Sequence, residues 1–162
     1  MELTAMGEFA SAVQARLRDR LAESCSGLSW RTEHRIAGTP VDIAGGDDDH
    51  LVLVELEWRR ADPADNTAKL FRHLSADRID RNRIAVAQVF TAYYDLNDGS
   101  VSSKRKNAEF VGRTAAESID RLSYQPVDFD LTPPKRGDDW PADWERTADR
   151  TAERIEECLG DR

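Results

Sequence analysis

The segment that most constrains the fold is a run of four aliphatic residues near the middle of the chain, Leu51–Val54, which continues into Glu55, Leu56, Glu57 and Trp58. An unbroken apolar run of this length, bounded by turn residues, is typical of a strand that is buried on both faces. Such a strand needs a covering layer on each side of its sheet. The run therefore predicts an α/β protein in which this strand is covered on both faces.

The other hydrophobic patterns give the order of the remaining elements. Apolar residues four apart predict a first helix, and alternation followed by turn signals predicts strands. The expected order is helix, three strands, helix, strand, helix, strand, helix, over residues 9–21, 28–36, 41–44, 51–58, 64–74, 83–94, 103–122, 127–131 and 141–159. The third helix is expected to carry one apolar stripe, made of Phe110, Val111, Ala115, Ile119 and Leu122. A chain of 162 residues fits a single domain.

The charge of the chain excludes some classes of partner but not others. Acidic residues outnumber basic ones by 31 to 23, which gives a net charge of −8. This balance argues against a general nucleic-acid coat or a polybasic membrane binder, and leaves room for a local basic groove. The chain has 19 Asp and 12 Glu, but 19 Arg and only 4 Lys, a bias typical of a GC-rich, salt-adapted genome such as that of a halophilic archaeon. In that setting acidity serves solubility and indicates little about partners.

No segment of the sequence has the pattern of a membrane anchor or of a leader peptide. The aliphatic run at 51–54 is far shorter than the ~20 residues that a membrane helix needs. The N-terminus lacks a positive region followed by an apolar one. Cys25 and Cys158 stand alone without metal-ligand spacing, which is typical of a reduced compartment. We expect a cytoplasmic protein with no membrane partner.

Three carboxylates are expected to meet at the ends of two neighbouring strands. Glu55 and Glu57 point to the same side of their strand, about 7 Å apart along the backbone. If the strands over 41–44 and 51–58 form a hairpin, Asp42 can lie beside them. Carboxylates held this close repel one another, and a hard divalent cation with oxygen ligands would neutralise them. The alternative for each residue taken singly is a solvated strand end or a turn cap.

The placement of these residues resembles the PD-(D/E)xK, or restriction endonuclease-like, nuclease superfamily. Asp42 lies in the segment TPVDI at 39–43, and the two glutamates lie in LVELEW at 53–58. The resemblance covers about residues 1–94 and implies a restriction-endonuclease-like core of helix, three strands, helix and strand, in which helices flank a mixed central sheet. Residues 103–162 would then be C-terminal additions to a single nuclease-like domain. Glu57 departs from the pattern, since most members have Lys at this point, although some restriction enzymes carry Glu there.

The resemblance implies Mg²⁺-dependent hydrolysis of phosphodiester bonds by a DNA endonuclease of restriction, repair or defence type. Asp42, Glu55 and the backbone carbonyl of Leu56 would hold Mg²⁺, or Mn²⁺ in its place. The ion would polarise the scissile phosphate and lower the pKa of a bound water. Glu57 would be a further ligand or would orient the attacking water.

In other members of the superfamily the lysine has moved to the following helix, and Lys69 is the candidate in this chain. Asn66, Lys69 and His73 are three and four residues apart, so they share one edge of the helix over 64–74. Lys69 would stabilise the negative charge that develops on the phosphorus, and Asn66 is an accessory candidate. The alternative for Lys69 is a solvated position at the helix edge.

DNA binding is expected from short basic segments. Arg59 and Arg60 directly follow the carboxylates and could contact phosphate. Lys104, Arg105 and Lys106 open the third helix, where free N–H groups and the positive end of the dipole suit a phosphate. Each of these residues has a solvated surface position as its alternative.

Two features at the ends of the chain stay open. Glu8 of the first helix could correspond to an acidic residue that archaeal Holliday-junction resolvases of the superfamily carry there, although a solvated position is the simpler interpretation. The last helix follows Trp140 and contains Trp144, and it either covers the sheet or makes a homodimer contact.

Two other functions fit the same sequence. A nuclease fold whose site has decayed at Glu57 would be a catalytically inactive nucleic-acid-binding or protein-interaction module. A small α/β protein could instead bind a basic partner through its acidic loop at 47–49. This last hypothesis predicts that Asp42, Glu55 and Glu57 do not cluster.

Overall fold

A five-stranded mixed sheet forms the centre of the molecule. The computed structural model describes residues 5–76 and 79–160. The strands lie side by side in chain order: β1 (Ser29–Ile36), β2 (Thr39–Gly46), β3 (His50–Glu57), β4 (Arg83–Thr91) and β5 (Leu122–Phe129). The first three strands pair antiparallel, whereas β3, β4 and β5 pair parallel. The predicted mixed sheet is therefore confirmed.

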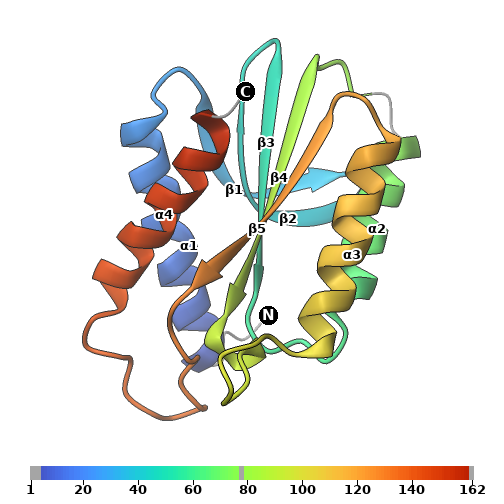
Figure 1. Ribbon diagram of the computed structural model, residues 1–162. Helices are drawn as coiled ribbons and strands as arrows, with labels where there is room; N and C mark the ends of the chain where they lie inside the picture. Colours follow the sequence, from blue (N-terminus) through green and yellow to red (C-terminus); the bar gives the residue numbers. More distant parts are fainter. Residues whose placement is uncertain (1–4, 77–78, 161–162) are drawn as a thin grey trace.

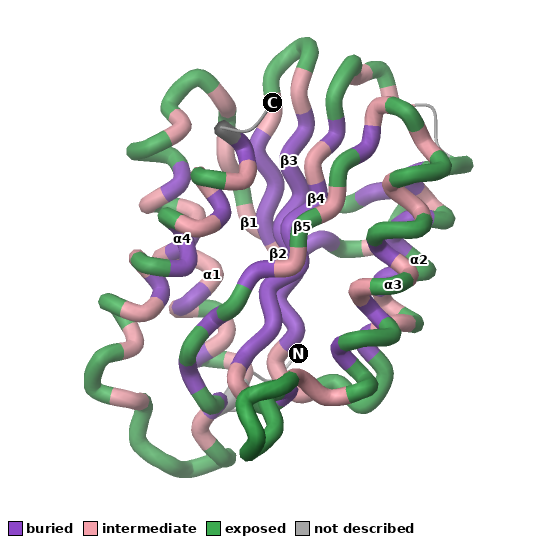
Figure 2. Tube along the Cα trace, viewed as in Figure 1, coloured by how far each residue is buried: buried purple, intermediate pink, exposed green. Residues whose placement is uncertain are grey.

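Helices cover both faces of this sheet (Figure 1). The helices are α1 (Ala5–Ser24), α2 (Pro63–Ala76), α3 (Ser103–Ser118) and α4 (Trp144–Gly160), with a short 3-10 helix η1 (Ala92–Tyr94). Residues of α1 and α4 pack with one face of the sheet, and residues of α2 with the other. Each face of β3 contributes to one of these two cores, and every residue from Leu51 to Glu57 is buried (Figure 2). The α/β class and the double burial of this strand are confirmed.

Four predicted boundaries were wrong. The strand expected over 83–94 ends at Thr91, whose hydroxyl accepts a hydrogen bond from Tyr93 N–H and so caps η1. The helix expected over 103–122 ends at Ser118, and β5 begins at Leu122 rather than at residue 127. Ile119 and Leu122 continue the helical spacing by chance, which hid the turn between them. The last helix begins at Trp144, three residues after the expected start.

The stripe predicted for α3 was also wrong in part. Phe110 is 70% exposed, whereas Ala108 and Gly112 are buried. Residues 108 and 112 are one turn apart, and residue 110 lies between them on the opposite side of the helix. Two small residues and Arg105 thus line the buried side of α3, so apolar character alone did not identify it.

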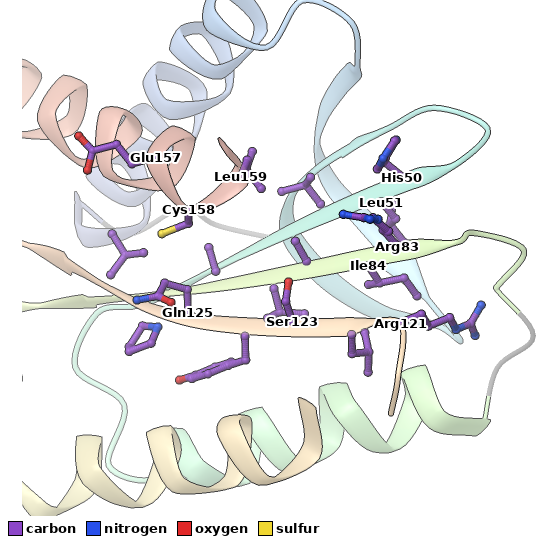
Figure 3. Close-up of a pocket in the computed structure, with 18 of the residues that line it drawn as sticks. His50, Leu51, Arg83, Ile84, Arg121, Ser123, Gln125, Glu157, Cys158 and Leu159 are labelled. Atoms are coloured by element: carbon purple, nitrogen blue, oxygen red, sulfur yellow. The ribbon is translucent and has the colours of Figure 1, made fainter. Parts of the chain in front are cut away.

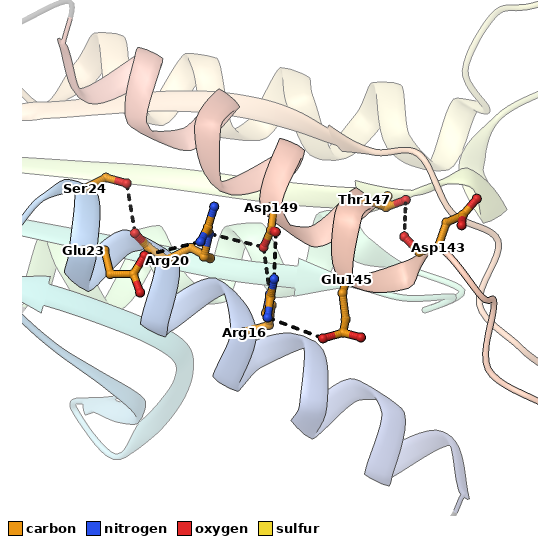
Figure 4. Close-up of polar contacts among 8 residues, drawn as sticks. All are labelled: Arg16, Arg20, Glu23, Ser24, Asp143, Glu145, Thr147 and Asp149. Carbon is orange, nitrogen blue, oxygen red and sulfur yellow. Dashed lines mark hydrogen bonds and ion pairs between the residues drawn. The ribbon is translucent and has the colours of Figure 1, made fainter.

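Polar contacts hold α4 against α1, which is the covering role that the sequence left as one alternative (Figure 4). The Arg16 guanidinium donates two hydrogen bonds of 2.8 Å to the Asp149 carboxylate. Arg20 lies 3.3 Å from the same carboxylate. The hydrogen bond from Arg16 holds the pKa of Asp149 below its ordinary value. The final helix therefore covers the sheet within one chain, and the homodimer stays a prediction.

Gly112 of α3 makes room for the ring of Tyr124 on β5. A Cβ atom at position 112 would lie far inside contact distance of that ring. We expect Gly112→Ala to destabilise the fold by about 1 kcal/mol, since overpacking of about 1–3 kcal/mol exceeds the gain in helix propensity of about 1 kcal/mol. Gly27→Ala is the control, because nothing lies within 4 Å of its Cβ position. Urea unfolding measures both, and equal stabilities would contradict the close approach.

Within residues 5–76 and 79–160, no helix combines the length and the apolarity that crossing a membrane requires.

Candidate functional site

The two glutamates at the end of β3 face the same side of the sheet. Glu55 is 7% exposed and Glu57 is 1% exposed. Glu55 lies next to Gln88 in the parallel pairing of β3 with β4. The side chains are two residues apart, so both point from β3 towards α2. The chain thus buries two carboxylates at the end of its most apolar strand.

Asp42 reaches the same place from β2. The paired positions of β2 and β3 end at Ile43 and Val54. One residue further along, Asp42 Oδ2 accepts a hydrogen bond of 2.7 Å from the N–H of Leu56. Its Oδ1 accepts another, of 3.0 Å, from Gln14 Nε2 of α1. The Asp42 carboxyl also lies near enough to the Glu55 carboxyl for its charge to raise the pKa of Glu55. The structure therefore brings Asp42 and Glu55 together, as the hairpin argument predicts.

Burial makes these carboxyl groups hard to ionise. Desolvation is the largest cause that raises the pKa of Asp42, Glu55 and Glu57 above their ordinary values. For Glu55 the charges of Asp42 and Glu57 add to burial, and its pKa lies well above the ordinary value. Neighbouring carboxyl groups that are buried in this way either share a proton or need a cation to neutralise their charge.

The donor set fits a hard divalent cation with two carboxylate ligands. Asp42 and Glu55 supply carboxylate oxygens, and Mg²⁺ commonly takes one or two carboxylates with water and phosphate oxygens completing its shell. Among the described residues, no group of three or more His, Cys, Asp and Glu side chains is arranged to hold an ion. The pair of Asp42 and Glu55 therefore fits, and Glu57 lies outside a ready-made three-carboxylate set.

One carboxylate oxygen of Glu57 accepts hydrogen bonds from two side-chain amide groups. Asn66 Nδ2 of α2 donates to Glu57 Oε1 at 2.6 Å, and Gln88 Nε2 of β4 donates to it at 3.3 Å. The other oxygen, Oε2, is buried and has no hydrogen-bond partner. Arg60 Nε lies 3.6 Å from that oxygen. Asn66, the accessory candidate, is thus a direct partner of Glu57.

The structure brings Arg60, and not Lys69, to the carboxylates. Lys69 is exposed, and no ion pair of it occurs within the described part of the chain. The buried side of α2 consists of Pro63, Thr67, Leu70, Phe71 and Leu74. Lys69 lies beside this stripe and not in it. His73 on the same edge contacts Thr39, with Nδ1 and Oγ1 2.6 Å apart. In the described structure, an arginine and not the predicted lysine therefore lies beside Glu57.

Two of the predicted DNA-contacting arginines are structural. Arg105 is buried and forms ion pairs with Asp128 at 2.7 Å and Glu109 at 2.8 Å. The helix turns this residue towards β5, so its guanidinium contacts the protein itself, and its contact with nucleic acid stays a prediction. Arg59 is half-buried, and its Nη2 donates to the carbonyl of Pro133 at 2.6 Å.

The other surface candidates remain available to solvent. Lys104 and Lys106 are exposed, and Lys104 Nζ lies 5.9 Å from the ring centroid of Tyr93. Glu8 is exposed in the first turn of α1. The residue of α1 that contacts the site is Gln14, for which the sequence carries no signal. Gln88 does have a signal in the sequence, since a glutamine interrupts the otherwise apolar strand β4.

A cavity lies elsewhere, between α4 and the strands β3, β4 and β5. It has a volume of about 790 Å³ and is lined by strand residues such as Ser123 and Gln125 and by Cys158 of α4 (Figure 3). None of Asp42, Glu55 and Glu57 lines it. The carboxylate site is thus separate from this cavity.

Comparison with known proteins gives little beyond the fold. No protein-family model matches the chain, and no curated protein matches it. Among solved structures, the chain is similar to a repair endonuclease from Pyrococcus abyssi, at 19% identity and a TM-score of 0.40. The match covers 74% of this chain and 47% of that one, so the chain spans about half the length of that protein. A likeness at this level says nothing of activity.

Proposed function

We propose that this protein is a Mg²⁺-dependent nuclease that hydrolyses phosphodiester bonds in DNA. The observation that carries the proposal is the convergence of Asp42 and Glu55, two buried carboxyl groups from neighbouring strands whose pKa values are raised. Their mutual repulsion supports a site for a cation, and their oxygens suit Mg²⁺ or Mn²⁺. The order of helix, three strands, helix and strand, with Asp on β2 and Glu-x-Glu closing β3, supports a variant of the PD-(D/E)xK superfamily.

The metal would be held by Asp42, Glu55 and the backbone carbonyl of Leu56. When bound, it supplies a Lewis acid that polarises a phosphate oxygen and acidifies water. Glu57 presents one carboxylate oxygen without a hydrogen-bond donor, so it can accept a proton from water or orient it. The Asn66 amide keeps the other oxygen occupied.

Arg60 takes the part that the sequence assigned to Lys69. Its side chain is 59% exposed while its Nε faces the buried Glu57 carboxylate at 3.6 Å. A guanidinium in this position can donate to a non-bridging phosphate oxygen and stabilise negative charge that develops during hydrolysis. Lys104 and Lys106, both exposed, would contact the phosphate backbone further away.

The test is cleavage of supercoiled plasmid and of labelled single-stranded and duplex oligonucleotides with Mg²⁺, Mn²⁺ or EDTA. We expect cleavage with either metal and none with EDTA. Glu55→Gln, purified in parallel, controls for contaminating nuclease. Metal-independent cleavage, or equal cleavage by the variant, would remove the carboxylates from the reaction.

A second candidate is a nuclease-fold protein that binds nucleic acid without cutting it. The exposure of Lys69 and the carboxylate at position 57 favour this candidate, because no lysine occupies the site. It predicts retained nucleic-acid binding in a mobility-shift assay without cleavage under any metal condition.

Arg60→Gln is expected to lower the cleavage rate by about 10- to 100-fold, whereas Lys69→Gln is expected to leave it within about twofold. The physical reason is that a charge-assisted hydrogen bond to phosphate contributes roughly 1.5–3 kcal/mol. Both substitutions remove one positive charge, so they change long-range attraction to DNA equally. Single-turnover cleavage measures both variants, and the opposite ranking would restore Lys69 to the site.

A further inference from the structure

A chain of polar side chains, buried except for the half-buried Tyr124, connects the carboxylate site to β5. Tyr124 on β5 contacts Gln88 on β4, with its hydroxyl 2.6 Å from Gln88 Oε1. Gln88 Nε2 contacts Thr67 Oγ1 at 2.8 Å and Glu57 Oε1 at 3.3 Å. Gln88 is 2% exposed, and it lies in a strand whose other central residues are apolar. A polar group in such a position is retained only if its hydrogen bonds are satisfied.

The direction of every hydrogen bond in this chain is fixed. The Thr67 hydroxyl donates its one hydrogen to the carbonyl of Pro63 at 2.9 Å, so its oxygen can only accept from Gln88. The NH₂ group of Gln88 must therefore face Thr67 and Glu57. Its carbonyl oxygen then faces Tyr124, which must donate its hydroxyl hydrogen. The amide of Gln88 cannot rotate by half a turn without losing these contacts.

This arrangement determines which oxygen of Glu57 stays open. Gln88 and Asn66 both donate to Oε1, and together they fix the carboxylate group in one orientation. Oε2 is left buried and without a hydrogen-bond partner, and the charged group that faces it is Arg60, with Nε 3.6 Å away. A carboxylate whose one oxygen accepts such hydrogen bonds presents its other oxygen to a ligand or to water. Residues that hydrogen-bond to the groups around a metal commonly fix their orientation in this way.

We propose that Gln88 is a positioning residue, held by Tyr124 and Thr67, that orients Glu57 so that its Oε2 supports divalent-cation binding by Asp42 and Glu55. The inference rests on the proposed metal site, and it assigns to β4 and β5 a part in that site. This role explains why the apolar strand β4 contains a glutamine, at the position that neighbours Glu55 of β3.

The experiment measures the dissociation constant of Mn²⁺ for the purified chain by titration calorimetry, without nucleic acid. We expect Gln88→Met to weaken Mn²⁺ binding by about tenfold or more, as removal of groups behind metal ligands commonly does. In a Glu57→Gln background the same substitution should have no further effect, because it acts through Glu57. Thr151→Val is the matched control, since Thr151 is fully buried and its hydroxyl donates to the Asp128 carbonyl, away from the site.

Each outcome decides one question. Mn²⁺ binding by the wild type with unchanged affinity in folded Gln88→Met would overturn the inference and leave the nuclease proposal intact. Equal weakening with and without Glu57 would make Gln88 a structural residue only. Absence of Mn²⁺ binding by the wild type would overturn the proposed metal site itself. If Gln88→Met does not fold, Tyr124→Phe replaces it, since this substitution removes only the hydroxyl. The inference then requires Tyr124→Phe to weaken Mn²⁺ binding when Glu57 is present and to have no effect in the Glu57→Gln background.

Discussion

Glu55→Gln is expected to abolish cleavage, with a loss of about 1,000-fold or more in rate. Glutamine keeps the size and one carbonyl oxygen of the side chain, but it removes the negative charge and one carboxylate oxygen. A hard cation binds weakly to an amide oxygen next to a single remaining carboxylate, Asp42. Mn²⁺ affinity should fall together with the cleavage rate. Retained cleavage would show that Glu55 is not part of the site.

The same substitution is expected to stabilise the metal-free protein at neutral pH by on the order of 1 kcal/mol. Glu55 is buried beside Asp42 and Glu57, and both charges oppose its ionisation. A neutral side chain removes that repulsion. A loss of activity with a gain in stability distinguishes a functional carboxylate from a structural one. Urea unfolding in EDTA measures the gain.

The pH dependence of this gain follows from the pKa of Glu55, which folding raises well above 4.5. Below pH 4.5 Glu55 is protonated in both the folded and the unfolded chain, so wild type and Glu55→Gln should be nearly equal in stability. As the pH rises from 4.5 towards the folded pKa, the unfolded state loses its proton first, and the wild type loses stability relative to the variant. Unfolding in EDTA at several pH values measures the difference. A difference that does not change with pH would contradict the raised pKa.

The convergence of the carboxylates was predictable because it depends on short-range geometry. Glu55 and Glu57 share a side because strand side chains alternate, and Asp42 reaches Glu55 because a short hairpin connects β2 to β3. The two-sided burial of β3 follows from its own composition. Each of these inferences needs only the residues of one segment and of its neighbour in the chain.

The partners of the carboxylates were not predictable, because they come from distant segments. Gln14 lies 28 residues from Asp42, and Gln88 lies 31 residues from Glu57. Whether Lys69 or Arg60 lies beside the carboxylates depends on how α2 is rotated about its axis over the sheet. The sequence of α2 places Lys69 at the edge of the buried stripe and does not determine whether that edge faces the carboxylates. The three basic residues Lys104, Arg105 and Lys106 are equivalent as far as the sequence shows. Only the packing of α3 against β5 determines that Arg105 is buried while the two lysines are exposed.

Arg105→Met is expected to destabilise the fold by about 3 kcal/mol, the largest stability effect that we predict. The Arg105 side chain is 7% exposed, and its guanidinium pairs with Glu109 and Asp128 while lying 4.7 Å from the ring centroid of Phe90. Methionine fills similar volume but removes both ion pairs and the cation–π contact. Removing one partner of a buried ion pair costs about 3–5 kcal/mol.

The expected loss lies at the lower end of that range because the two carboxylates are not equally buried. The Asp128 side chain is 57% exposed and regains water when Arg105 is removed, whereas Glu109 is 15% exposed and keeps Arg113 as a partner at 2.9 Å. Lys104→Met and Lys106→Met are the controls, since both residues are exposed neighbours on α3. Urea unfolding should show losses within about 0.5 kcal/mol for both. Mobility-shift assays should show the reverse order for DNA, with weaker binding by the lysine variants than by folded Arg105→Met. If Arg105→Met instead loses DNA affinity and keeps its stability, the buried ion pairs do not hold α3 to β5, and the middle residue of the basic segment faces the nucleic acid.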